Sequence, residues 1–249
     1  MRLLVLGSNG TYPTPGRPCS GFLVEAGATA LMLDAGPGTV AALQAAGAVA
    51  RLSALLVTHA HPDHCADVFS LFNLLRLGPE PRSGLPALAP AGLAAGLAQF
   101  LGAGEDHSFH RVFDWQTVAA GDRVGVGDLE LAFGLAVHQV TTLVTSCAAG
   151  GRRLVYSADS GPGGDLAALA AGADLLLCDA TFQGEPDAAG WPYHLSATGA
   201  GVLARAAGVR RLLLTHLSPM LDPERSVAEA VAVFGGPVDW AAPGLEVEV

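Results

Sequence analysis

The segment 58–64 constrains this chain more than any other part of the sequence. It reads Thr-His-Ala-His-Pro-Asp-His and follows the apolar run 52–57, so three imidazoles and a carboxylate fall within six residues. Side chains alternate along an extended segment, which makes His59 and His61 point the same way. Pro62 suits the first turn of a helix, which would turn the aspartate and the third histidine back toward them. Four ligand-type side chains at a strand end predict a metal site.

Length and composition limit the class of protein. The 249 residues are 51% apolar and 14% charged, a balance typical of a buried multilayer α/β protein. Neither a linker nor a shift of composition divides the chain, so we predict one domain over residues 1–249. Lysine is absent, which excludes Schiff-base chemistry and a lysine nucleophile.

The charge balance limits the partners. The formal net charge is −10, and the two adjacent arginine pairs, 152–153 and 210–211, each flank a predicted strand. A protein that holds a long polyanion normally presents a basic face, so we expect no extended nucleic-acid partner. Bound divalent metals would offset the acidic charge locally, which keeps a small anionic substrate compatible. The glycine-rich opening 7–11 matches no nucleotide-binding pattern.

Cysteine spacing and hydropathy indicate the compartment. The four cysteines show no CxxC pair, so they predict neither a disulfide framework nor a zinc ribbon, and Cys65 is expected to fill core space. No signal-peptide pattern opens the sequence, and no apolar stretch reaches the ~20 residues that a membrane span requires. We therefore predict a reduced, soluble, cytoplasmic protein without a membrane partner.

Predicted strands come in two batches, each followed by helices. This order predicts an α/β fold with two sheets packed face to face and helices outside. The predicted elements include a hairpin, a long strand, three helices and a capping residue: Gly21–Ala26 with Thr29–Leu33, Leu129–Val137, Thr39–Ala48, Ala66–Leu77, Ala197–Ala207 and Ser196.

The chain contains an internal echo. Residues 55–62 read Leu-Leu-Val-Thr-His-Ala-His-Pro, and residues 212–219 read Leu-Leu-Leu-Thr-His-Leu-Ser-Pro. Ser218 stands in the second copy where the first has His61. Eight residues are a short match, but they fit a pseudo-symmetric fold.

Three further ligand candidates, His138, Asp159 and His216, each lie just beyond a predicted strand. A single histidine is more often structural or exposed, and it is the repeated strand-end position that distinguishes these residues. His107 and His110 lack that position, and we interpret them as surface loop residues.

The segment His59-x-His61-x-Asp63-His64, followed in order by the three later candidates, resembles the metallo-β-lactamase-fold hydrolase superfamily. The resemblance covers essentially the whole chain, since its motif segments run from Asp34 to His216. It implies a four-layer αβ/βα sandwich with two metals in a groove at the edge of the two mixed sheets. It also implies that a homodimer can form.

The resemblance assigns the candidates to two metal ions. His59, His61 and His138 would hold the first ion, and Asp159 would bridge to the second. The second ion would have three further ligands: Asp63, His64 and His216. The ions would be zinc, with manganese or iron(II) as alternatives. They would share one hydroxide, because zinc lowers the pKa of bound water to about 7.

Asp34 has two readings. As a member of the motif set it would accept the far N–H of a ligand histidine. Alternatively it would cap the helix that starts after it. Asp63 belongs to the catalytic set as well as to the ligands.

The C-terminal half resembles the RNase Z-like and cyclic-phosphodiesterase-like branch. The matching segments are 156–160, 175–182 and 194–198. By this resemblance His194 would assist departure of the leaving oxygen, and Asp179 would orient His194. RNase Z carries a glutamate, one methylene longer, where this chain has Asp179.

These observations predict a dinuclear metal-dependent phosphodiesterase that acts on small or cyclic phosphodiesters. The chain shows no inserted arm of the kind RNase Z uses to clamp tRNA, which disfavours tRNA 3′-processing. The nearest alternative is a thioesterase of the glyoxalase II type or a lactamase of the same fold. A non-catalytic metal-binding protein is a third possibility, although no ligand is missing.

Overall fold

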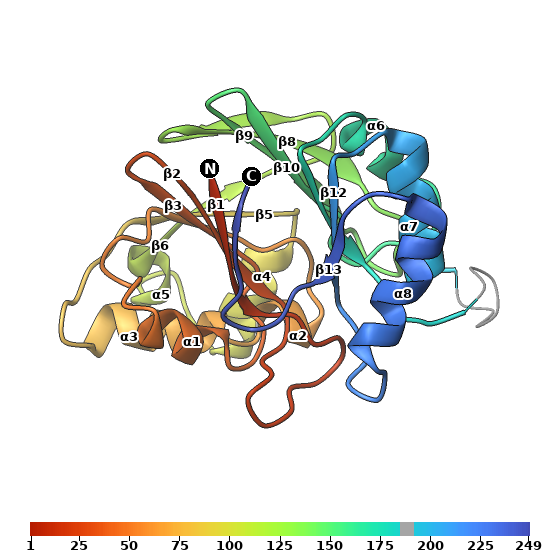
Figure 1. The fold of residues 1–249 in the computed structure, drawn as a ribbon. Coiled ribbons are helices and arrows are strands. Elements are labelled where there is room, and N and C mark those ends of the chain that lie inside the picture. Colours follow the sequence, from red (N-terminus) through yellow and green to blue (C-terminus); the bar gives the residue numbers. More distant parts are fainter. Residues whose placement is uncertain (185–191) are drawn as a thin grey trace.

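The computed structural model describes residues 1–184 and 192–249 and consists of two seven-stranded sheets packed face to face (Figure 1). The first sheet has the order β14 (Glu246–Glu248), β1 (Arg2–Gly7), β2 (Gly21–Ala26), β3 (Thr29–Leu33), β4 (Ala54–Leu56), β5 (Leu85–Ala89), β6 (Phe113–Thr117). The second has the order β13 (Val238–Trp240), β12 (Arg211–Thr215), β11 (Leu175–Asp179), β10 (Arg152–Tyr156), β9 (Leu143–Ala149), β8 (Leu129–Leu135), β7 (Arg123–Val126). β1 pairs with β14, so the two chain ends lie side by side.

Helices cover the outer face of each sheet (Figure 1). The first sheet is flanked by α1 (Thr39–Ala45), α2 (Pro62–Cys65), α3 (Val68–Leu77), α4 (Leu93–Phe100) and α5 (Phe109–Val112). The second is flanked by α6 (Leu166–Ala170), α7 (Ala197–Ala207) and α8 (Pro223–Phe234). No helix in 1–184 or 192–249 is both long and apolar enough to cross a membrane.

Three apolar clusters account for the layers. One lies between the sheets and includes Phe22, Tyr156 and Leu213. The other two fill the spaces between each sheet and its own helices. Central strands such as β11 are buried along their whole length, as expected where both faces of a sheet are covered. The predicted αβ/βα sandwich is confirmed.

Parallel pairing in both sheets brings strand ends together. β3, β4 and β5 are parallel neighbours in the first sheet, and β10 to β13 are parallel neighbours in the second. β4 and β12, the strands that carry the internal echo, each lie between two parallel neighbours. Polar side chains that follow these strands can therefore meet at one edge of the sandwich.

Most predicted elements are present, and some boundaries differ. The β2–β3 hairpin and α7 have the predicted bounds, and Ser196 caps α7 by accepting from the Gly199 N–H at 3.0 Å. α1 ends at Ala45 rather than Ala48, and β8 ends at Leu135 rather than Val137.

The predicted helix 66–77 is wrong in one respect, because it begins at Val68 and a separate short helix precedes it. Asp67 is engaged elsewhere: its carboxylate accepts from the Gly38 and Val40 N–H groups, and its N–H donates to the Ala35 carbonyl. Tertiary contacts at the start of α1 thus separate α2 from α3.

The region of His107 and His110 also differs from the prediction. His110 is exposed, but it lies in the short helix α5 rather than in a loop. His107 is half-buried, and its Nδ1 accepts from the Phe109 N–H. Cys65 is buried in the cluster beneath the first layer of helices, as expected.

Candidate metal centre

The predicted ligand residues converge at the edge where the two sheets meet. His59 and His61 follow β4, Asp159 follows β10, His216 follows β12, and His138 comes three residues after β8. Pro62 occupies the first turn of α2, as predicted, and directly follows the residue at the N-cap position. The turn into α2 brings the aspartate and the histidine at positions 63 and 64 back toward the strand end.

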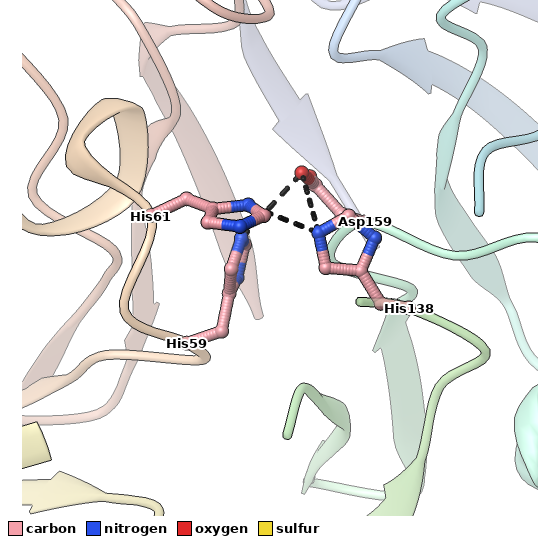
Figure 2. Close-up of side chains that lie close together, drawn as sticks. All are labelled: His59, His61, His138 and Asp159. Carbon is pink, nitrogen blue, oxygen red and sulfur yellow. Dashed lines mark hydrogen bonds and ion pairs between the residues drawn. The ribbon is translucent and has the colours of Figure 1, made fainter. Parts of the chain in front are cut away.

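The first group consists of His59, His61, His138 and Asp159, whose ligand atoms lie within 4.8 Å of one another (Figure 2). His61 Nδ1 and His138 Nε2 are 3.0 Å apart. Asp159 Oδ2 is 3.5 Å from His59 Nε2 and 3.6 Å from His138 Nε2. Two residues of the group thus come from the first sheet and two from the second.

The second group consists of Asp63, His64 and His216. Asp63 Oδ2 is 3.1 Å from His216 Nε2 and 3.9 Å from His64 Nε2. The other oxygen of Asp159, Oδ1, is 2.9 Å from His64 Nε2 and 3.4 Å from His216 Nε2. Asp159 therefore turns one carboxylate oxygen to each group.

Buried polar atoms show that the centre is suited to metal ions. Within the described residues, His59 Nε2, His64 Nε2 and Asp159 Oδ1 are buried and make no hydrogen bond of regular geometry, although His64 Nε2 and Asp159 Oδ1 lie 2.9 Å apart. Buried polar atoms are normally hydrogen-bonded, so three such atoms in one place point to a bound ion. Imidazole nitrogens and carboxylate oxygens are the donors that bind divalent transition metals.

The ionisation of the centre also favours metal binding. Burial, together with the charge of His64, lowers the pKa of His59 to about 4. For Asp159, burial acts to raise the pKa, but the charges of His216 and His64 hold it well below its usual range. Burial acts to lower the pKa of His216, but Asp159 and Asp63 raise it to about 9. Metal ions bind carboxylates and neutral imidazoles, so they would displace the protons on the second group.

Asp34 lies beneath the centre and contacts a ligand histidine directly. It is fully buried, and its Oδ2 is 2.7 Å from His64 Nδ1. It also accepts from the Thr58 N–H at 2.7 Å, the Thr58 hydroxyl at 2.9 Å and the Tyr156 hydroxyl at 2.8 Å. The alternative reading as a helix cap is wrong, because Gly38 occupies the N-cap position of α1. The sequence reasoning missed the contacts of Thr58 and Tyr156.

His194 lies beside the second group and is held by Asp179. Its Nδ1 is 2.8 Å from Asp179 Oδ2, so aspartate reaches the histidine despite being one methylene shorter than glutamate. The ring stacks on His216 with centroids 5.2 Å apart and planes inclined by 4°. The Thr181 hydroxyl lies 2.7 Å from Asp179 Oδ1 and 2.8 Å from His216 Nδ1. Thr181, which the sequence reasoning did not assign, thus links the two histidines.

The glycine-rich opening of the chain contributes to the centre. The Thr11 N–H donates to Asp63 Oδ2 at 2.7 Å. Gly10 packs against His216 so closely that a Cβ there would lie 2.9 Å from the ring. The glycine therefore permits a close approach to a ligand histidine.

Backbone strain is concentrated around the same residues. In the described part of the chain, four non-glycine residues have positive φ: Thr11, Asp34, Ala158 and His216. His216 is itself a candidate ligand, and Ala158 directly precedes another, Asp159. The other two, Thr11 and Asp34, each contact a candidate ligand. Such conformations cost free energy and persist where the surrounding structure imposes them, commonly at functional sites.

Comparison with known proteins places this centre in a family. The model of the beta-lactamase superfamily domain matches residues 29–217. An uncharacterized protein of Mycobacterium tuberculosis is 36% identical over 243 residues, covering 96% of this chain and 88% of its own length. The ribonuclease Z of Haloferax volcanii is 30% identical over 302 residues, covering 100% of this chain and 95% of its own.

A solved structure agrees with these matches. The metallo-beta-lactamase fold protein YhfI of Bacillus subtilis, also named a probable metallo-hydrolase, shares the fold with a TM-score of 0.87 and 26% identity. The match covers 99% of both chains. This protein is therefore a metal-dependent hydrolase of the beta-lactamase superfamily, in its ribonuclease Z-like branch.

Proposed function

We propose that this hydrolase is a dinuclear metal-dependent phosphodiesterase that acts on small or cyclic phosphodiesters. The observation that carries the proposal is the position of Asp159, whose two oxygens face two separate groups of ligand residues. One ion would be held by the histidines at 59, 61 and 138, and the other by Asp63, His64 and His216. Asp159 would belong to both.

The ligand residues are positioned by their neighbours. Two bound divalent ions, zinc or alternatively manganese or iron(II), would polarise the phosphate and activate a water for attack on phosphorus. Asp34 accepts at Nδ1 of His64, which leaves Nε2 of that histidine directed into the centre. The Thr11 N–H holds the Asp63 carboxylate, and the Thr181 hydroxyl holds Nδ1 of His216.

His194 is our candidate for the general acid. Asp179 accepts a hydrogen bond at Nδ1, so a proton on Nε2 is free to pass to the departing oxygen. A thioester releases a thiolate, which departs without a proton, whereas an alkoxide that leaves phosphorus needs one. The Asp179–His194 pair is thus the observation that favours a phosphodiester over a thioester.

Charge supports a small substrate. The chain has a net charge of −10 and no lysine, which disfavours a long polyanion. The name of the Haloferax relative denotes cleavage of RNA, whose backbone is a phosphodiester. The shared bond type and the negative net charge together favour nucleotides, cyclic phosphates or short RNA ends over folded RNA.

The proposal is tested by His194→Ala in metal-replete protein. We expect turnover of a 2′,3′-cyclic nucleotide, whose leaving group is a ribose alkoxide, to fall by roughly 10²–10⁴-fold, the usual worth of general acid catalysis, with both metals retained by elemental analysis. His110→Ala is the matched control, because His110 is exposed and lies outside both groups.

Two results would contradict the proposal. Near-normal turnover by His194→Ala would remove that residue from the mechanism. Wild-type turnover of a glutathione thioester or a β-lactam far above that of the phosphodiester would assign a different substrate class.

A further inference from the structure

A cavity of about 550 Å³ lies next to the metal centre and plays no part in the chemistry described above. Its walls come from α2, the first half of α3, α4 and the turn at 140–141. The apolar side chains around it include Phe69, Leu93, Leu97 and Phe100. Its size is that of a pocket for a small organic molecule.

Chain neighbours of the first group of ligand residues line the cavity. Ala60 and Pro62, which line it, are the two neighbours of His61 in the chain. Val140 also lines the cavity and follows His138 by two residues. His61 and His138 are themselves 3.0 Å apart, so the same two segments form the first group and border the cavity.

The lining carries no charged side chain, whereas the adjacent centre is built from carboxylates and histidines. Phe69 and Phe100 form a stacked pair there, with centroids 5.0 Å apart and planes inclined by 22°. Phe100 is 79% exposed, so one large aromatic ring faces solvent at this place. An apolar pocket beside a charged centre suits a ligand with a phosphate at one end and a flat apolar group at the other.

The leaving group would occupy a different place. His194, our candidate acid, comes from the second sheet's side, and no described residue between Asp179 and Ser196 lines the cavity. The group released in the reaction would face His194. The cavity is therefore placed to hold the substituent that stays on the phosphate.

We propose that this cavity binds an aromatic group, such as a nucleobase or an aryl ring, attached to the retained side of the phosphodiester. The proposal rests on the proposed function, since it assigns the substrate class of the same site. Stacking on aromatic side chains is tolerant of the ring's identity, which would make the pocket selective for aromatic over small alkyl diesters.

Gly96 provides a way to fill the pocket without disturbing the fold. It lines the cavity on α4, is exposed, and a Cβ there would meet no atom within 4 Å. Leucine is also a better helix former than glycine. Ala95→Leu is the matched control, because Ala95 is exposed on the same helix and lines a different hollow.

The experiment compares two diesters with the same leaving group, phenyl p-nitrophenyl phosphate and methyl p-nitrophenyl phosphate. For the wild type and Ala95→Leu we expect a KM about tenfold lower for the phenyl ester, which corresponds to a single aromatic stacking contact. In Gly96→Leu we expect this preference to disappear while kcat for the methyl ester is retained.

A phenyl preference that survives Gly96→Leu would overturn the proposal, and so would the absence of a preference in the wild type. If Gly96→Leu instead dissociated a dimer and left the KM ratio unchanged, the cavity would be a contact between copies, and the proposal would be wrong.

Failure of the proposed function has a different signature. The wild type would then turn over neither diester, and calorimetric titration with phenylphosphonate and methylphosphonate would still test the pocket. Tighter binding of phenylphosphonate, lost in Gly96→Leu, would support it, and equal binding would overturn it.

Discussion

The loops after β4 and β12 begin with nearly the same residues and contribute very differently to the centre. Both strands lie between parallel neighbours, and a Thr-His pair stands at or just beyond the end of each. The first loop enters α2 at Pro62 and supplies four candidate ligands. The second continues into a turn, has Ser218 in place of a histidine, and supplies only His216. The helix start after the first loop makes the difference.

Each loop is supported by an acid at the end of the adjacent parallel strand. Asp34 follows β3 and contacts His64. Asp179 ends β11, contacts His194, and reaches His216 through the Thr181 hydroxyl. The two acids therefore occupy equivalent positions but differ in what they support. Asp34 orients a candidate ligand, and Asp179 orients the candidate acid catalyst.

The largest expected effect comes from removing the residue that both loops face. Asp159→Ala should reduce the metal content from two ions to less than one per chain, because both groups lose a shared carboxylate. Turnover should fall by more than the ~10²–10⁴-fold expected from loss of the general acid alone. Elemental analysis and phosphodiester turnover measure this, with the exposed Asp114→Ala as control. Retention of two ions would show that the two groups bind independently.

Substituting the two supporting acids should have different effects, one on metal affinity and the other on turnover. Asp34→Asn should weaken metal affinity by roughly 10–100-fold, because His64 loses the acceptor that orients it. Asp179→Asn should keep both ions and lower turnover by no more than His194→Ala does, because the residue acts through His194. Chelator titration and kcat separate the two variants. If both variants changed metal affinity and kcat in the same way, the proposed difference between the roles of Asp34 and Asp179 would be wrong.

The smallest effect concerns helix starts. Ser196 caps α7 with its side chain, whereas His61, at the same position of α2, makes no cap and is free for the centre. Ser196→Ala should cost about 1 kcal/mol of the free energy of unfolding and lower Tm by about 2–4 °C. Thermal unfolding measures this against Ser108→Ala, since Ser108 precedes α5 without a side-chain cap bond. Equal losses would mean that the cap contributes nothing at α7.

Local patterns in the sequence were sufficient to predict the candidate ligands and the layers. His59, His61 and Pro62 lie within four residues of one another. Side-chain alternation along an extended segment and the geometry of a helix start are therefore sufficient to predict where these residues point. The apolar runs of the two batches of strands likewise predicted two sheets with helices outside. The pairing of Asp179 with His194 came from family resemblance, and the structure shows their contact.

Only the tertiary structure decided how these residues are supported and what lies beside them. The Asp34 contact with Tyr156, the Thr11 contact with Asp63 and the break before α3 at Asp67 all join segments distant in sequence. The cavity between α4 and the turn at 140–141 is formed in the same way. No short-range pattern encodes such contacts, because they depend on which strand ends meet when the two sheets pack.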